Sequence, residues 1–343
     1  RIISPAPRDA WRTALTRDEH ALPEHAPEWL DAIVATGRYA DASRHYRFDD
    51  GRELVLPLVR RTGPAGLGGW LLSHPPAWGI GGLVGDADSA SVAEVITDLR
   101  RMSAHRIWVR PDPMAADLWA GAVALDGSAT VVPRRAHIVD LSGGFDPVLA
   151  RMPRATRKYM RRAERAGVRV EIGYGGDMLH VHDVLYRKSV DRWAKRQHEP
   201  QALARWRAGR RDPVEKLETM ARHLGNRFVL AVGYVDDQPA FSALMLLGPT
   251  AHVTRSAMDV DLVGPTKVGT LVHRRLLQLA CDAGCTRYHL GESGNSESLA
   301  QFKEGLGAIA VDYAEYRFER LPYTRADTVA RTIVKKVLHF RDT

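Results

Sequence analysis

Predicted helices and strands alternate along both halves of the chain, and this order limits the possible folds more than any single motif does. In the second half, the spacing of apolar residues predicts these elements in order: a helix at 151–166, a strand at 168–174, helices at 176–197 and 213–225, strands at 227–237, 238–248 and 250–259, a helix at 264–284, and strands at 285–291 and 310–321. Asp236, Asp237 and Gln238 indicate a hairpin turn between the first two consecutive strands.

The first half contains the same kinds of element. They are a helix that stops at Gly37, a strand at 51–61, a strand–loop–strand segment at 68–86, a helix at 88–104, a strand at 105–111 and one or two strands within 129–142. Each half then has the order helix, strands, helix, strand, which favours an α/β or α+β class. Because 343 residues favour two domains, we expect domains at 1–145 and 146–325 and an amphipathic helix at 326–343.

The net charge of the chain is strongly positive. A formal charge of +8 and a pI near 9.6 indicate a polyanionic partner, such as nucleic acid, phosphorylated metabolites or an anionic membrane surface. However, 41 of the 49 basic residues are arginine, and a biased composition explains that number equally well. The distribution of the charge is therefore more informative than its total.

The helix predicted at 151–166 carries the densest charge. Residues 151–170 contain eight basic side chains and one acid, Glu164. The basic residues that recur every three or four positions form one cationic ridge: Arg154, Arg157 or Lys158, Arg161 and Arg165. Like charges at this spacing repel one another, and a phosphate-rich ligand would relieve the repulsion. The ridge predicts a polyanion-binding surface; the alternative is a solvated helix face with salt bridges to another element.

Two further places combine cations with other anion- or base-binding features. Lys267 stands in the first turn of the helix predicted at 264–284, where free N–H groups bind anions and the helix dipole disfavours a cation. An ordinary helix start is the alternative. Arg192 and Trp193 lie on the long predicted helix, where the tryptophan either stacks a nucleobase or is half-buried core with the arginine across it.

The sequence lacks the motifs of several common kinds of site. Cys281 and Cys285 are one helical turn apart without nearby histidine ligands, which predicts buried thiols in a reducing compartment rather than a zinc site. The chain has no nucleophile-elbow, zinc-protease or Walker motif, and its 14 histidines lack ligand spacing, so we expect no metal. Without a signal core or about 18 consecutive apolar residues, the chain is expected to be soluble and cytoplasmic.

A polar segment after the strand at 285–291 places a phenylalanine next to a lysine. Residues 292–308 read ESGNSESLAQFKEGLGA, with Phe302 and Lys303 on a short predicted helix. A lysine near the carboxyl end of a strand, beside a ring that limits water, is a positioned cation for a phosphate or a developing oxyanion. A solvated helix lysine is the alternative.

Three segments of the second half resemble the Fem family of non-ribosomal peptidyl transferases and related GNAT-like N-acyltransferases. In the family's order, they are TRKYMRRAERAGV, LACDAGCTRYHLGES and LAQFKEGLGA, and the resemblance covers roughly residues 150–320. It implies two tandem GNAT-like domains, each a mixed central sheet flanked by helices, with a cleft between them. The coiled-coil arm of some members is absent from 197–226, and the first half resembles the family only in its order of elements.

The resemblance also implies a reaction. Family members transfer an aminoacyl group from aminoacyl-tRNA to an amine, usually on a peptidoglycan precursor, while relatives act on small metabolites. Phe302 and Lys303 fall on the family's Phe-Lys pair, whose lysine contacts donor phosphates near the acyl end, and Arg157 falls on the interdomain basic helix. An aminoacyl ester is already activated, so catalysis needs positioning and oxyanion stabilisation without a further cofactor. Glu292, the donor itself or water would accept the proton of the amine.

Two other functions fit the same residues. An acyl-CoA-dependent N-acyltransferase would share the double fold, and a non-catalytic RNA-binding protein would use the cationic ridge but not Phe302 and Lys303. Apolar and basic residues also separate along 328–341, as in helices that lie on a membrane surface. Packing of that helix on its own domain explains the pattern equally well, so peripheral membrane contact is an open alternative.

Overall fold

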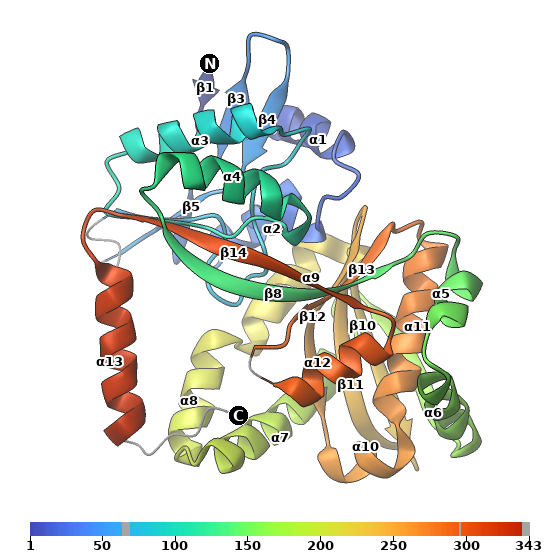
Figure 1. Ribbon diagram of the computed structural model, residues 1–343. Coiled ribbons are helices and arrows are strands. Elements are labelled where there is room, and N and C mark those ends of the chain that lie inside the picture. Colours follow the sequence, from blue (N-terminus) through green and yellow to red (C-terminus); the bar gives the residue numbers. More distant parts are fainter. Residues whose placement is uncertain (64–68, 295, 338–343) are drawn as a thin grey trace. The chain divides into compact units, whose positions relative to one another are not determined.

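The computed structural model describes residues 1–63, 69–294 and 296–337 (Figure 1). It contains two compact units, which we call unit 1 and unit 2. Unit 1 comprises Arg1–Ala136 and Val311–Val329, and unit 2 comprises His137–Ala310 and the segment from Ala330 onward. These units differ from the expected domains 1–145 and 146–325 mainly at residues 311–325. That segment groups with unit 1, because β14 (Ile309–Glu319) pairs with β7 (Arg106–Val109).

Unit 1 has a small antiparallel sheet and a larger mixed sheet. The small sheet has the order β1 (Ile2–Ile3), β3 (Arg44–Arg47) and β4 (Glu53–Leu56). The larger sheet has the order β2 (Tyr39–Asp41), β5 (Val59–Arg61), β6 (Trp70–Leu72), β7, β14 and β8 (Thr130–Asp140). The helices are α1 (Arg8–Thr16), α2 (Pro27–Ala35), α3 (Ser89–Arg101) and α4 (Ala116–Asp126), with 3-10 turns at Pro23–His25 and Pro113–Ala115. Strands β6 and β7 are parallel, whereas β7 and β14 are antiparallel.

The core of unit 1 forms where α3 and α4 pack on the larger sheet. Asp88 caps the predicted helix by accepting a hydrogen bond from the backbone N–H of Ser91, so α3 begins where the sequence indicated. Trp119 of α4 is almost completely buried and stacks on Tyr316 of β14, with 5.8 Å between the ring centroids. The closing strand of the chain thus completes the core that the first 136 residues begin.

Two strand predictions for unit 1 are wrong. The single strand expected at 51–61 is broken into β4 and β5 around Pro57, which has no N–H to donate to a ladder. Those two strands join different sheets. In 68–86, Trp70–Leu72 forms a strand, but the second expected strand is reduced to one bridge between Val55 and Val84. The helices α1 and α4 were not predicted.

Unit 2 is a mixed sheet covered by helices on both faces (Figure 1). Its strand order is β8, β13 (Arg287–Glu292), β12 (Ala251–Met258), β11 (Gln238–Leu247), β10 (Phe228–Val235) and β9 (Arg169–Tyr174). The helices are α5 (Phe145–Arg151), α6 (Arg154–Arg165), α7 (Leu179–Gln197), α8 (Gln201–Arg211), α9 (Val214–Leu224), α10 (Val260–Thr266), α11 (Val268–Asp282) and α12 (Glu297–Gly305), with a 3-10 turn at Gly225–Arg227. The last described element is α13 (Tyr323–Val337), where an amphipathic helix was expected at 326–343; residues 338–343 of that expectation lie outside the described residues.

Close packing on the sheet fixes the positions of α11 and α7. A Cβ on Gly233 of β10 would lie 2.3 Å from Val268 and 2.8 Å from Val272, so the glycine lets α11 approach the strand. The neighbouring Ser242 points to the opposite face, where its hydroxyl lies 2.9 Å from Nδ1 of His182 on α7. The three consecutive strands and their hairpin are confirmed, with Asp236 and Asp237 both in the left-handed region.

Three helix predictions for unit 2 need correction. The helix expected at 264–284 is two helices, α10 and α11, separated by Lys267 in a left-handed conformation (φ +59°). The long helix begins at Leu179 rather than at 176, and the basic helix begins at Arg154 after Pro153, which follows a separate α5. Helix α8 was not predicted. None of the helices among the described residues combines the length and apolar character that crossing a membrane requires.

Candidate functional site

Lys303 is buried and fixed by two backbone carbonyl groups. It lies on α12, where Ser296 caps the first turn by accepting a hydrogen bond from the N–H of Leu299. The side chain is only 5 % exposed, and Nζ donates to the carbonyl oxygens of Gly291 (3.2 Å) and Glu292 (3.0 Å). The alternative of a solvated helix lysine is therefore wrong. The ammonium points to the carboxyl end of β13.

Burial also changes the acidity of this lysine. Loss of solvent lowers the pKa of Lys303 from 10.5 to about 8, while the neighbouring carboxylate of Glu292 acts in the opposite direction. Near neutral pH the amine is therefore mainly protonated and carries a positive charge. Two of its three N–H bonds donate to these carbonyl groups, and no partner is recorded for the third among the described residues.

Phe302 lies on a different side of α12 from the lysine contacts. It is half-buried against the core of unit 2, and its ring centroid is 5.5 Å from that of His273 on α11. His273 is buried, and its Nδ1 lies 2.8 Å from the hydroxyl of Tyr288. Phe302 therefore anchors α12 to the core, which holds Lys303 in place.

Three buried histidines surround the carboxyl end of β13, and sequence analysis did not identify them. His137, His252 and His289 come from β8, β12 and β13, and each is less than 5 % exposed. The rings of His252 and His289 meet edge to face, with 4.4 Å between their centroids. Since these residues are far apart in the sequence, only the sheet order brings them together. Among the described residues, no group of three or more His, Cys, Asp or Glu side chains is arranged to hold a metal ion.

The two parallel strands beside this cluster share only a short ladder. Strands β12 and β13 pair at Ala251 with Tyr288 and at His252 with His289. Both strands continue beyond these pairs, to Met258 and Glu292 respectively. Lys303 reaches the β13 backbone in this region.

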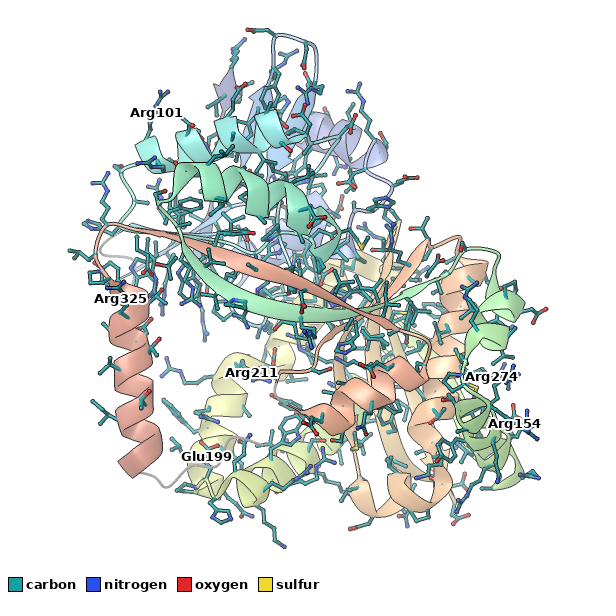
Figure 2. All side chains as sticks on the ribbon, in the orientation of Figure 1. Arg101, Arg154, Glu199, Arg211, Arg274 and Arg325 are labelled. Carbon is teal, nitrogen blue, oxygen red and sulfur yellow. The ribbon has the colours of Figure 1, made fainter. Side chains whose placement is uncertain are left out.

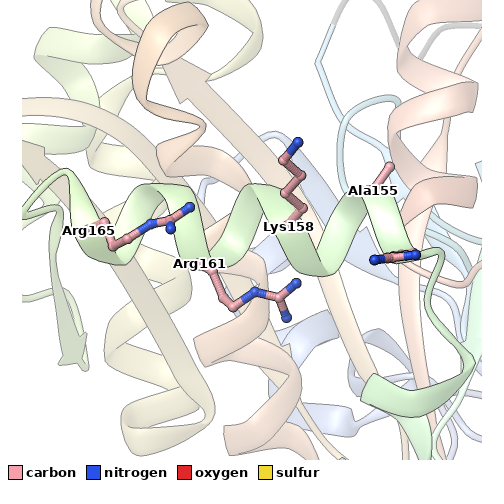
Figure 3. Close-up of a pocket in the computed structure, with 5 residues that line it drawn as sticks. Ala155, Lys158, Arg161 and Arg165 are labelled. Carbon is pink, nitrogen blue, oxygen red and sulfur yellow. The ribbon is translucent and has the colours of Figure 1, made fainter.

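The cationic ridge predicted on the basic helix lines a pocket of about 500 Å³. Its lining residues are Arg154, Ala155, Lys158, Arg161 and Arg165, which project from α6 (Figure 3). The four cations recur at i, i+4, i+7 and i+11, so they share one helix face. No hydrogen bond or ion pair joins their side chains to any other described residue, so the alternative of a face neutralised by salt bridges does not apply to them.

Arg157 is the exception among the predicted ridge residues. Its side chain is turned away from the pocket and donates to the carbonyl of Ala150 at 3.2 Å. The single acid of the helix, Glu164, also lies outside the pocket and forms an ion pair with Arg274 of α11. Figure 2 labels Arg274 and the pocket residue Arg154 of α6. The ion pair of Glu164 therefore links α6 to α11 without neutralising the positive charge of the pocket.

The remaining predicted binding residues lie in two places. Lys267 is near α6, because its ammonium is 5.5 Å from the ring centroid of the exposed Tyr159. Trp193 on α7 is half-buried and packs against the small apolar cluster between α7 and α8, with the Arg192 guanidinium 5.9 Å from its ring. The contacts of Trp193 match the packed alternative, and its binding role stays a prediction.

Comparison with known proteins places these features in a common fold. Residues 150–304 match the acetyltransferase (GNAT) domain family, and no curated protein sequence matches the chain. The chain is similar to the crystal structure of FemX, with a TM-score of 0.70 and 11 % identity over 93 % of this chain and 97 % of FemX.

Two further solved structures show the same similarity. A conserved protein of unknown function from Bacteroides thetaiotaomicron has a TM-score of 0.56 and 10 % identity, covering 91 % of this chain and 97 % of that one. The C-terminal domain of a putative lysylphosphatidylglycerol synthetase from Agrobacterium fabrum has a TM-score of 0.51 and 13 % identity, covering 96 % of each chain. The predicted mixed α/β fold is confirmed, with a GNAT match in unit 2. The resemblance to Fem-like proteins is confirmed as a fold shared with FemX over nearly the whole chain. The GNAT match supports an acyltransferase.

Proposed function

We propose that the protein transfers an aminoacyl group from aminoacyl-tRNA to an amine acceptor, either a cell-wall precursor or a small metabolite. The observation that carries this proposal is the pocket on α6, where four cations without protein partners lie in the same unit as the buried Lys303. A polyanionic donor would neutralise the pocket, and the lysine would act on the acyl end of that donor.

The proposed chemistry needs no protein nucleophile. The neutral amine of the acceptor attacks the ester carbonyl, so that a C–N bond forms, the ester C–O bond breaks and the ribose hydroxyl of the tRNA leaves. The remaining N–H of Lys303 stabilises the negative charge that develops on the carbonyl oxygen. The proton of the amine passes to the leaving oxygen through Glu292, the donor or water, and we propose Glu292 for this step because it adjoins Lys303.

The proposed donor side of the site uses the cations of unit 2. Arg154, Lys158, Arg161 and Arg165 would contact phosphates, and Lys267 would extend this surface through Tyr159. A donor-binding role is also proposed for Arg157, Arg192 and Trp193. It requires that the contacts these side chains make in the structure change when the donor binds. The catalytic group is Lys303 with Glu292, and Phe302 positions it. No metal or further cofactor enters this reaction, and we propose a cytoplasmic location, where aminoacyl-tRNA is found.

The printed name of one structural neighbour agrees with this class of reaction. FemX shares the fold over nearly the whole chain, and the Agrobacterium protein is named as a synthetase of lysylphosphatidylglycerol, a product in which an amino acid is joined to a lipid. We extend only the class, aminoacyl transfer, to this chain, because the identities of 11 % and 13 % carry no information on substrates.

An acyl-CoA-dependent N-acyltransferase is the second candidate. The observations that favour it are the GNAT match over residues 150–304 and the short ladder between β12 and β13, beyond which a donor's amide groups can pair with strand backbone. A non-catalytic RNA-binding protein is the third candidate. It would use the α6 pocket, and replacement of Lys303 would leave its RNA affinity unchanged.

The deciding experiment measures transfer of radiolabelled amino acids from a mixed aminoacyl-tRNA pool to an extract of small amines and cell-wall precursors. Wild type is compared with Lys303→Met, which keeps the length of the side chain but removes the charge, and with RNase-treated donor. Label that moves only with intact tRNA and falls at least tenfold in the variant supports the proposal. Acylation supported by acyl-CoA instead would establish the second candidate, and RNA binding without transfer the third.

A further inference from the structure

We propose that His289 is a positioning residue for Lys303: its imidazole fixes the strand end whose carbonyl groups hold the lysine ammonium. This inference rests on the proposed role of Lys303 and adds a residue that does not touch the reactants. It identifies one function for the buried histidine cluster at the end of β13.

A short chain of hydrogen bonds connects the two side chains. The backbone N–H of Gly291 donates to Nδ1 of His289 at 3.0 Å. The carbonyl oxygens of Gly291 and Glu292 in turn accept hydrogen bonds from Nζ of Lys303 at 3.2 and 3.0 Å. The orientation of one peptide segment thus depends on the imidazole at its start and determines where the ammonium lies.

This segment needs such support because its backbone departs from the strand. The pairing of β13 with β12 ends at His289, and Gly291 adopts a left-handed conformation with φ +69°. Glycine adopts this conformation at no steric cost but also has the greatest freedom to leave it. The hydrogen bond to His289 limits that freedom at the residue whose carbonyl faces Lys303.

The imidazole is suited to act as a fixed acceptor. His289 is 2 % exposed, and the ring of His252 packs against it. Burial, together with His252, the ammonium of Lys303 and His137, lowers the pKa of His289 well below 6.5. The ring is therefore neutral, and because Nδ1 accepts from Gly291, its proton is on Nε2. A protonated ring would have no free lone pair at Nδ1.

Two substitutions separate the acceptor from the ring. His289→Phe keeps an aromatic ring against His252 but removes the acceptor. His289→Asn removes the ring but restores an acceptor, because asparagine side chains accept hydrogen bonds from the backbone N–H two residues further on. If positioning is the role, the asparagine variant resembles wild type and the phenylalanine variant does not, whereas a purely packing role predicts the reverse.

The first measurement needs no substrate. Competitive labelling of amines over a series of pH values, read by mass spectrometry, gives the pKa of Lys303 in each full-length variant. The other groups that face Lys303 are Glu292 of β13 and His273 of α11, and both are retained. We expect the pKa of Lys303 to fall below about 8 in His289→Phe, because the carbonyl groups that favour the charged amine are no longer held, and to stay near 8 in His289→Asn. An unchanged or higher pKa in the phenylalanine variant overturns the proposal.

The second measurement uses whichever acyl donor supports activity. In His289→Phe, kcat is expected to fall about tenfold to a hundredfold with little change in KM, because a small displacement of a catalytic group has an effect of this size. His289→Asn is expected to retain kcat within about threefold. Equal losses in both variants overturn the proposal. Because the labelling result does not depend on the donor, failure of the proposed tRNA reaction leaves that test of His289 intact.

Discussion

The ammonium of Lys267 lies 5.5 Å from the centroid of the Tyr159 ring, so the residue between α10 and α11 is attached to the exposed side of α6. Tyr159 is 42 % exposed and, among the described residues, does not belong to the apolar core of unit 2. The four pocket cations lie on the same helix, α6, so this contact joins Lys267, the predicted anion-binding lysine, to the helix that carries the pocket. The sequence had suggested both features without connecting them.

Replacement of Tyr159 tests how much this contact stabilises α6. Tyr159→Leu is expected to lower the free energy of unfolding by about 0.5–1 kcal/mol, the usual contribution of an exposed cation–π pair. Tyr159→Phe keeps the ring face and is expected to lose less than half of that. Urea unfolding of the two variants makes the comparison, and equal losses would show that the ring face is not involved.

Adjacent arginines on α6 provide a matched test of the pocket. Arg161 lines the pocket, whereas Arg162, which is also exposed, does not. Arg161→Gln is expected to weaken tRNA binding and to reduce the slope of log affinity against log salt concentration by about 0.7–0.9, the value for one lost phosphate contact. Arg162→Gln is expected to leave the slope near that of wild type. Filter binding at several salt concentrations measures both, and identical slopes would contradict a specific role of the pocket.

The depressed pKa of Lys303 predicts how stability depends on pH. The pKa is about 8 in the folded chain and 10.5 for a free lysine, so between these values the unfolded chain binds more protons and stability rises with pH. Below pH 8 the buried charge costs about 3 kcal/mol relative to pH values above 10.5. Lys303→Met removes this dependence.

The measurement compares the two proteins by chemical unfolding at intervals from pH 7.5 to 10. The stability of Lys303→Met relative to wild type is expected to decrease steadily over this range, because only wild type gains stability as its lysine loses the proton. A constant difference would mean that Lys303 has an ordinary pKa and is solvated in solution.

Two glycines with similar backbone angles separate strain from function. Gly291 has φ +69° and Gly284, after α11, has φ +77°. Alanine at either position is expected to lower the free energy of unfolding by roughly 1–2 kcal/mol, because an L-residue resists the left-handed region. A Cβ would make only ordinary contacts at Gly291 and none at Gly284, so sterics add little. Only Gly291→Ala is expected to lose activity, since only that residue presents its carbonyl to Lys303; an equal loss at Gly284 would refute the assignment.

Long periodic segments of the fold were predictable from the sequence. The helices α3 and α11 and the three strands β10 to β12 carry regular apolar spacing. Asp88 marks the start of α3 and the hairpin residues mark the turn between β10 and β11, whereas no side-chain cap marks the start of α11. The failures have local physical causes. Pro57 breaks the strand expected at 51–61, but it lies within a run of apolar residues, so apolar spacing does not reveal the break. Helix α8 is rich in arginine and has a single buried residue, Ala204, so it has no apolar stripe to detect.

The site was predictable only where its residues are close in sequence. Four of the predicted ridge residues share one helix face, and helical spacing was enough to find them. The same spacing could not distinguish Lys158, which lines the pocket, from Arg157, whose side chain donates to a backbone carbonyl. The histidine cluster required the order β8, β13, β12, which brings residues 137, 289 and 252 together. The carbonyl contacts of Lys303 depend on a left-handed glycine, which sequence periodicity does not report.

The division of unit 1 into two distant segments has a consequence for the order of folding. Residues 137–310, the main segment of unit 2, are continuous in sequence and contain its whole core cluster. Unit 1, in contrast, needs residues 311–329 for the strand that pairs with β7 and supplies Tyr316 to Trp119. During synthesis, which proceeds from the N-terminus, the first 136 residues emerge before their last strand exists. Residues 1–136 are therefore completed after the segment that follows them. They leave the ribosome with an open sheet edge, while residues 137–310, which carry the α6 pocket, can already close their own core.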